Sequence, residues 1–275
     1  MVGAAGDTAV GGTAAHRAWS RHTVRQRWTR YFITLLIGLA AYWSLASIDI
    51  EPEWALDAPA QIGDLIGRMT PPDFSRLPQI IGAIVETLNI ATIATVLGVL
   101  VSMPVAWLAA QNTTPNQATL WLGRFILVSS RSVNTIIWAL LFVAIFGPGV
   151  LAGIIAIMFR SIGFLGKLMS EAIEEIDRAP IEALEAVGAS RSKVLLYGVV
   201  PQVIPTFVAV TILRWDINLR ESTVLGLVGA GGIGLILQGA IDTFAWQTVS
   251  TILLAIIAMV VAGEALAAWL RNKVI

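Results

Sequence analysis

Residues 171–205 read EAIEEIDRAPIEALEAVGASRSKVLLYGVVPQVIP, a charged and polar stretch in a chain that is otherwise mostly apolar. Apolar residues recur within it on one side of a helix: Ile181, Leu184 and Val187. Glu182 and Glu185 fall on another side, so the spacing predicts a short amphipathic helix. The apolar side of this helix needs a cover from elsewhere in the protein.

The sequence also marks the ends of this helix. Pro180 suits the first helical position, where a missing amide hydrogen costs nothing, and Gly188 suits the residue just past the end, where a left-handed conformation is needed. Ser190 is a candidate cap for the segment that follows. Pro201 and Pro205 then interrupt the next apolar run near its beginning. The stretch therefore predicts a helix with a defined start and end.

The composition places the chain among polytopic helical membrane proteins. Of its 275 residues, 56% are hydrophobic and 13% are charged, and the formal net charge is zero. The chain has no cysteine, which excludes a disulfide framework and thiol catalysis, and its only two histidines, His16 and His22, lie in the polar amino-terminal tail. We therefore expect no catalytic residue and no metal site.

A motif stands inside the polar stretch, where Glu182, Ala183 and Gly188 are followed by Pro201. It resembles the EAA loop of ABC-transporter permeases, whose pattern is Glu-Ala-Ala, three residues, Gly, nine residues and Ile-x-Leu-Pro. The resemblance implies that residues 179–191 form a cytoplasmic coupling helix seated in a groove of an ATPase subunit. The coupling residues that it implies are Ile181, Glu182, Ala183, Leu184, Glu185, Gly188, Ala189 and Ser190.

The chain departs from this pattern at three positions. Leu184 replaces the second Ala, Gly198 stands where Ile is usual, and Val200 precedes the Pro in place of Leu. All three residues are small or apolar. The departures therefore concern how the helix fits the groove of the ATPase subunit rather than whether it acts as a coupling helix. The alternative is an ordinary amphipathic loop helix of a membrane protein, which leaves the combined match of Glu, Gly and Pro unexplained.

Charge and proline content predict how the chain is divided. Residues 1–30 carry five arginines and one acid and form a basic cytoplasmic tail, followed by an additional transmembrane helix at 31–48. Residues 49–78 hold six acids and five prolines and form an external loop with a short surface helix at 62–69. For residues 79–275, the resemblance to ABC-transporter permeases implies a five-helix permease core. Nucleic-acid binding by the arginines is the alternative, which their position beside a membrane helix disfavours.

We expect six transmembrane helices, with both termini cytoplasmic. The expected segments are 31–48, 80–110, 119–146, 150–169, 197–219 and 247–270. Four basic residues around the polar stretch place it in the cytoplasm: Lys167, Arg178, Arg191 and Lys193. The clean apolar run 133–146 is short for a span, so the third helix begins before Arg131 or lies within a protein-lined interior.

A glycine-rich stretch, RESTVLGLVGAGGIGLILQGAIDTF, covers residues 220–244 between the last two spans. Gly229, Gly231 and Gly234 formally match a dinucleotide-binding pattern, but no βαβ unit surrounds them. We expect a bend that lets a re-entrant segment fold back into the protein. The sequence VGAGGIG resembles the stretch found at this place in permeases for phosphonates and for methionine.

Charged residues within the expected spans are candidates for function, because each costs about 2.5–3.5 kcal/mol on insertion scales. They are Glu86, Arg131, Arg160, Arg214, Asp216, Arg220, Glu221 and Glu264. Asp216 and Arg220 are four residues apart and can pair, a structural role that needs no ligand. The functional alternative is a translocation path for an anion, since guanidinium groups bind phosphate-type oxygens in a two-pronged way. Its expected residues are Asn134, Arg160, Asn218, Arg220 and Glu221.

Taken together, the chain resembles an all-α integral membrane permease of the type I ABC importer (MetI-like) fold. Residues 131–153 and 213–234 most resemble phosphonate permeases. The resemblance implies transport of a phosphonate or related phosphorus oxyanion, delivered by an extracytoplasmic substrate-binding protein, across the plasma membrane of a bacterial cell. It further implies a second copy of the permease, contact with membrane lipid, and an ATPase subunit dimer on the cytoplasmic face.

The chain itself is expected to contain no cofactor. Gly166 and Lys167 do not belong to a P-loop, because Leu168 follows and Ser161 stands where the first glycine is needed, so ATP and Mg are expected on the partner ATPase. Two alternatives share much of this interpretation. One is an ABC permease for methionine or another small solute; the other is a secondary transporter or channel, which needs no ATPase and often has an internal repeat.

Overall fold

The structure, a computed structural model, describes residues 24–48 and 52–274, and every regular element in them is helical. In chain order the elements are α1 (Val24–Ser47), α2 (Pro52–Met69), α3 (Leu77–Ala109), α4 (Gln117–Ser132), α5 (Thr135–Phe146), α6 (Val150–Glu174), α7 (Ala179–Ala186), α8 (Arg191–Val194), η1 (Leu195–Val199), α9 (Val200–Leu225), η2 (Gly226–Val228), α10 (Ile233–Asp242) and α11 (Trp246–Val274). Residues 1–23 of the expected tail, residues 49–51 of the expected loop and residue 275 lie outside the described residues.

The chain divides into two compact units, residues 1–61 and 62–275. In the first unit, α1 is a 24-residue helix whose described side chains are exposed along its length, and it is long and apolar enough to cross a membrane. The helix expected at 62–69 is longer than predicted, because α2 begins at Pro52. A proline in the first turn, Glu53 after it and Arg68 in the last turn all favour a helix of this length.

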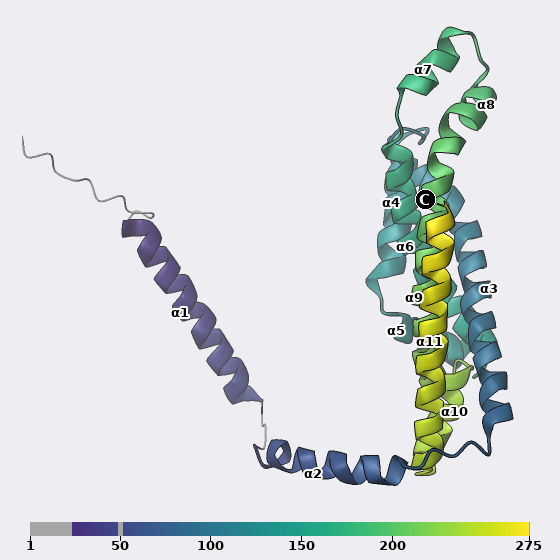
Figure 1. Cartoon of the computed structure of the whole chain (residues 1–275). Helices are drawn as coiled ribbons and strands as arrows, with labels where there is room; N and C mark the ends of the chain where they lie inside the picture. Colours follow the sequence, from purple (N-terminus) through teal and green to yellow (C-terminus); the bar gives the residue numbers. More distant parts are fainter. Residues whose placement is uncertain (1–23, 49–51, 275) are drawn as a thin grey trace, which may run out of the picture. The chain divides into compact units, whose positions relative to one another are not determined.

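The second unit is a bundle in which α6 packs along α3 and also contacts α4, α5 and α9 (Figure 1). Fully buried side chains along this seam include Ile90 on α3 and Ile157 and Leu165 on α6. In the described part of the chain, five helical segments are long and apolar enough to cross a membrane, or six when the bent pair α4–α5 counts as one span. The all-α membrane fold predicted from the sequence is confirmed.

The third expected span is a pair of helices rather than one. α4 and α5 meet at an angle of 88° at residues 133–134. Asn134 caps α5, since its side-chain oxygen accepts a hydrogen bond from the Ile136 amide at 3.1 Å. The carbonyl of Val133, freed by the break, accepts a hydrogen bond from Arg160 on α6 at 3.0 Å. Broken backbone can therefore lie inside the bundle, because protein side chains replace the missing helical partners.

The glycine stretch after α9 makes the expected bend. Gly229, Gly231 and Gly232 all have positive φ, and the start of α10 folds back so that Gly234 lies against Gly226. The bend is anchored on α3: the Gly232 amide donates to Glu86 Oε1, and the Ile233 amide donates to Thr87 Oγ1, each at 2.8 Å. Glu86 thus satisfies an amide at the amino-terminal end of α10, which explains a carboxylate within an apolar helix.

The start of α3 is tied to the start of α11. The Asp73 amide donates to the Gln247 carbonyl at 3.2 Å, and the Thr251 hydroxyl donates to the Asp73 carbonyl at 2.8 Å. The amide and hydroxyl of Ser75 both donate to the Asp73 carboxylate, and these bonds hold the pKa of Asp73 below its usual value. This joint fixes one end of the bundle, opposite the end that carries α7 (Figure 1).

Candidate translocation path and coupling helix

Three polar residues on α9 point into the bundle. Arg214, Asn218 and Glu221 are spaced four and three residues apart, which puts them on one helix face. Arg214 is only 2% exposed, although it carries a full charge. Its Nε donates to the Ser161 hydroxyl at 2.9 Å, and its guanidinium lies 5.3 Å from the centre of the Phe164 ring. A charge buried this deeply needs a counter-ion.

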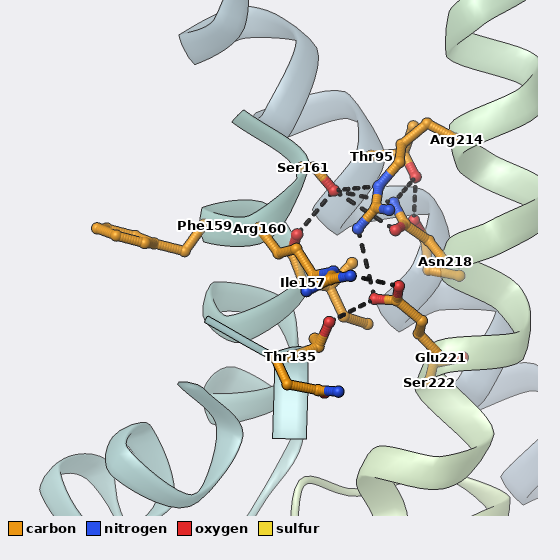
Figure 2. A network of polar contacts seen from close by, with 12 residues as sticks. Thr95, Thr135, Ile157, Phe159, Arg160, Ser161, Arg214, Asn218, Glu221 and Ser222 are labelled. Atoms are coloured by element: carbon orange, nitrogen blue, oxygen red, sulfur yellow. Dashed lines mark hydrogen bonds and ion pairs between the residues drawn. The ribbon is translucent and has the colours of Figure 1, made fainter. Parts of the chain in front are cut away.

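Glu221 is that counter-ion, and it is shared (Figure 2). One carboxylate oxygen, Oε2, lies 3.4 Å from the guanidinium of Arg214 and accepts a hydrogen bond from the Thr135 hydroxyl at 2.8 Å. The other, Oε1, lies 3.6 Å from Nε of Arg160. Two guanidinium groups therefore face one carboxylate, and the three side chains carry a net positive charge.

Arg160 is the accessible member of this cluster. Its side chain is 31% exposed, against 22% for Glu221 and 2% for Arg214. One terminal nitrogen holds the Val133 carbonyl at the α4–α5 break, and the ion pair with Glu221 is loose at 3.6 Å. Part of the guanidinium consequently remains available to a further anionic group.

Asn218 joins the cluster to α3. Its amide donates to the Thr95 hydroxyl at 2.8 Å and lies 3.3 Å from the Ser161 hydroxyl, and the side chain is completely buried. The polar cluster thus links four helices: Thr95 on α3, Thr135 at the start of α5, Ser161 on α6, and Asn218 and Glu221 in the second half of α9 (Figure 2). In this conformation the Asn218 side chain is bonded to Thr95 and Ser161 and does not line an open path.

The remaining two expected path residues lie outside this cluster. Arg220 pairs with Asp216 at 2.6 Å, as their spacing predicted, and its side chain is 45% exposed. The other oxygen of Asp216, Oδ1, is buried without a partner among the described residues. Asn134 is exposed and caps α5 one residue before Thr135. The structure therefore brings Arg160, Asn218 and Glu221 together and leaves Asn134 and Arg220 at their sides.

The polar helix of the EAA-like stretch is α7, Ala179–Ala186, which is shorter than the expected 179–191. Pro180 lies in its first turn, and Gly188 follows its end at φ +76°, as the sequence predicted. The Gly188 and Ala189 amides donate to the carbonyls of Glu185 and Leu184 at 2.9 and 3.0 Å, which closes the helix. Ser190 stands at the cap position of α8, but its side chain makes no capping hydrogen bond.

The apolar side of α7 is covered by η1. A β-carbon placed on Gly198 would lie 3.2 Å from Leu184 Cδ1 and 3.3 Å from Ile181 Cγ1, so these side chains occupy the space that a larger residue would need. Val187, expected on the same apolar side, is instead 79% exposed. Glu182, Ala183 and Glu185 are also exposed. A cavity of about 300 Å³ beside α7 is lined by Asn112, Thr113, Ile176, Arg178, Ile181, Glu182, Glu185 and Val199.

Gln202 on α9 holds the entry to α7. Its side-chain oxygen accepts from the Asp177 amide at 2.9 Å, while its side-chain nitrogen donates to the Asp177 carbonyl at 3.2 Å and to the Gly198 carbonyl at 2.6 Å. The Asp177 carboxylate in turn accepts from the Ala179 amide at 3.0 Å. We call Asp177 and Gln202 the α7 clamp, since together they fix the first turn of α7 to α9.

Sequence reasoning missed several of these residues. It placed Arg214 among the intramembrane charges but not in the path, and it did not single out Thr95, Thr135, Ser161, Asp177 or Gln202. A signal existed for Arg214, because it precedes Asn218 and Glu221 at spacings of four and three on one helix. None existed for the small hydroxyl residues, whose partners lie on other helices.

A helical bundle with a charged cluster inside it and a clamped polar helix at one end defines a multi-pass membrane transport protein. The chain belongs to the binding-protein-dependent transport system inner membrane component family, whose model matches residues 98–275. Members of this family are permease subunits rather than enzymes.

Similar proteins agree with this assignment. The chain is 41% identical to the phosphite transport system permease protein PtxC of Stutzerimonas stutzeri, over 86% of this chain and 85% of that protein. It is 40% identical to the phosphate-import permease protein PhnE of Mycolicibacterium smegmatis, over 82% of this chain and 42% of that protein. Inward-facing structures of the MetNI methionine ABC transporter share the fold, with a TM-score of 0.63 and 21% identity over 74% of this chain and 99% of that chain.

Proposed function

We propose that the chain forms the translocation path for a small phosphorus oxyanion, such as phosphite, phosphonate or phosphate, in an ATP-driven importer. The observation that carries the proposal is the pair of guanidinium groups, Arg160 and Arg214, around the single carboxylate of Glu221. The excess positive charge suits an anion, and the exposed part of Arg160 offers planar, paired donors for its oxygens. The similar permeases named for phosphite and phosphate support the same substrate class.

Glu221 would then serve as the resting partner of Arg160. An entering oxyanion can replace the loose carboxylate contact at 3.6 Å, while Thr135 and Arg214 keep Glu221 in place. Asn134 and Arg220, exposed beside the cluster, complete the proposed path.

The partners follow from the family and from α7. An extracytoplasmic binding protein would deliver the anion, and two copies of the chain would enclose the path. ATP and Mg would be bound by an ATPase dimer in contact with α7 and the 300 Å³ cavity beside Glu182 and Glu185. This arrangement places α7 and both termini in the cytoplasm of a bacterial cell, an orientation that agrees with the basic residues around α7.

The proposal is tested by reconstituting the chain with its ATPase and binding protein in liposomes. Uptake of radiolabelled phosphite, phosphate or a phosphonate should be strong, and methionine should neither be transported nor compete. Arg160→Gln should lower uptake at least about tenfold, the effect of losing one charge-assisted hydrogen bond pair, while ATP hydrolysis continues. Arg271→Gln, which removes one charge in the last turn of α11 and outside the proposed path, is the matched control. Methionine uptake, or full oxyanion uptake by Arg160→Gln, would contradict the proposal.

A further inference from the structure

A second basic site lies between α4 and α6, apart from the central cluster. It is a cavity of about 240 Å³ lined by Arg124, Leu127, Val128, Arg131, Lys167, Ser170 and Glu174. Three of these side chains are cationic and one is acidic, so the lining is positive overall. A cavity of this size is smaller than a site for a drug-sized ligand and suits a small charged group.

Two residues that line this cavity, Leu127 and Arg131, also lie at a close crossing of α4 and α6. A β-carbon on Gly163 would meet the Leu127 carbonyl at 2.5 Å and the Arg131 amide nitrogen at 2.9 Å, so only glycine allows α4 to lie so near α6. The Ser130 hydroxyl fastens the crossing, because it donates to the Phe159 carbonyl and accepts from the Gly163 amide. Arg131 is therefore held on a fixed backbone at the wall of the cavity.

The cations of the cavity are only partly neutralised. Arg124 pairs with Glu174 at 3.1 Å, and Lys167 pairs with Glu171 at 2.7 Å. Arg131 is exposed and has no hydrogen bond or ion pair with any residue in the described part of the chain. The donors of this guanidinium are therefore free to bind an anion that enters the small basic cavity.

We infer that this cavity binds a phosphate-type oxyanion, with Arg131 as its principal donor. Two sources share this chemistry: the headgroup of an anionic phospholipid, and a free oxyanion such as phosphate or phosphite. Trp121 and Phe125 are 65% and 69% exposed on the neighbouring face of α4, which gives acyl chains an apolar surface beside the cavity. The inference does not depend on the role proposed for Arg160 and Glu221.

The experiment compares the wild-type chain with Arg131→Gln, Lys167→Gln and the control Arg271→Gln in neutral detergent. In one arm, native mass spectrometry measures the affinity for added phosphatidylglycerol against phosphatidylcholine. In the other arm, isothermal titration calorimetry measures binding of inorganic phosphate. Arg131→Gln should bind the ligand that occupies the cavity, either phosphatidylglycerol or inorganic phosphate, about tenfold more weakly than the wild-type chain. Lys167→Gln should weaken binding of the same ligand. Melting temperature should be unchanged in Arg131→Gln, because its side chain has no described partner.

The outcomes separate the two sites. A loss in the lipid arm assigns the cavity to a headgroup, and a loss in the phosphate arm assigns it to a free oxyanion. Wild-type affinity of Arg131→Gln in both arms overturns the inference, as does an equal loss in Arg271→Gln. Arg160→Gln is measured alongside: if it weakens phosphate binding while Arg131→Gln changes neither arm, the cavity is rejected and the proposed path stands.

Discussion

Leu184 and Gly198 each depart from the usual EAA pattern, and the structure shows that the two departures fit together. Leu184 places a larger side chain where alanine is usual, and Gly198 leaves space where isoleucine is usual. A β-carbon built on Gly198 would lie only 3.2 Å from Leu184 Cδ1. In the usual pattern the larger side chain of this pair lies at the η1 position, whereas here it lies on α7, as Leu184. Such an exchange keeps the packing between the two elements.

We therefore expect Gly198→Ile to disrupt the packing of α7, with an overpacking cost of about 1–3 kcal/mol. Adding Leu184→Ala should recover most of that loss, because the two residues compete for one volume. Hydrogen exchange of residues 179–186 measures the effect directly. Independent, additive effects of the two substitutions would refute the compensation.

The two ion pairs of α9 should differ sharply in their effect on stability. Glu221→Ala leaves Arg214, 2% exposed, without a counter-charge, and should cost about 3–5 kcal/mol. Asp216→Ala leaves Arg220, whose side chain is 45% exposed, and should cost at most about 1 kcal/mol. Denaturant unfolding in detergent micelles compares the two variants, and equal losses would show that burial of Arg214 is not the deciding factor.

The ion pairs also show which contacts could be predicted from the sequence and which could not. The Asp216–Arg220 pair was predicted because spacing on one helix is visible in the sequence. The Arg160–Glu221 pair joins α6 to α9, and its members are 61 positions apart in the chain. Only the crossing of the two helices brings them together, and no local pattern encodes that crossing.

At the scale of elements, the α7 clamp couples α7 to α9. Gln202 binds both the amide and the carbonyl of Asp177, just before α7, so under the proposed function a displacement of α7 would be passed to α9. A rigid connection of this kind is what force transmission requires. The clamp lies at the surface, where water competes for the same hydrogen-bonding groups. Its stability therefore depends on the paired geometry of the two Gln202–Asp177 hydrogen bonds rather than on burial.

Gln202→Ala should loosen this connection. We expect faster hydrogen exchange in residues 179–186 and a severalfold lower ratio of oxyanion uptake to ATP hydrolysis, because the clamp loses three hydrogen bonds. Gln238→Ala, which removes an exposed contact to Asp242 on α10, is the control. Unchanged coupling in Gln202→Ala would mean that α7 transmits force without the clamp.

The helices themselves were largely visible in the sequence, but the α4–α5 break was not. Pro180 and Gly188 marked α7, and the glycine stretch marked the bend before α10. Neither Val133 nor Asn134 is a glycine or a proline; Asn134 caps α5 locally, and Arg160 from another helix binds the freed Val133 carbonyl. A tertiary hydrogen bond of this type overrides the helical preference of a continuous apolar run.

At the scale of the whole molecule, the bundle of residues 62–275 forms a compact unit of its own. The MetNI chain aligns over 99% of its length with 74% of this chain, and the family model begins at residue 98. The division into an additional helix at 31–48 and a permease core at 79–275 remains a prediction from the sequence.

We expect a chain shortened to begin at Ile62 to fold and to keep its melting temperature within about 5 °C, since its buried core is retained. Size-exclusion chromatography and thermal unfolding test folding, and uptake in liposomes tests transport. The full-length chain, purified in the same detergent, is the reference. Aggregation of the shortened chain in every detergent tried would show that α1 belongs to the fold of the core.

The right-angle break between α4 and α5 means that neither helix spans a membrane by itself. With 16 and 12 residues, the two helices are about 24 and 18 Å long, and neither alone crosses a hydrocarbon layer of about 30 Å. The charged cluster sits at the joint, so polar surface begins partway through the bilayer. If the proposed path is correct, a cargo molecule would meet charged side chains at this joint before it had crossed the full width of the membrane.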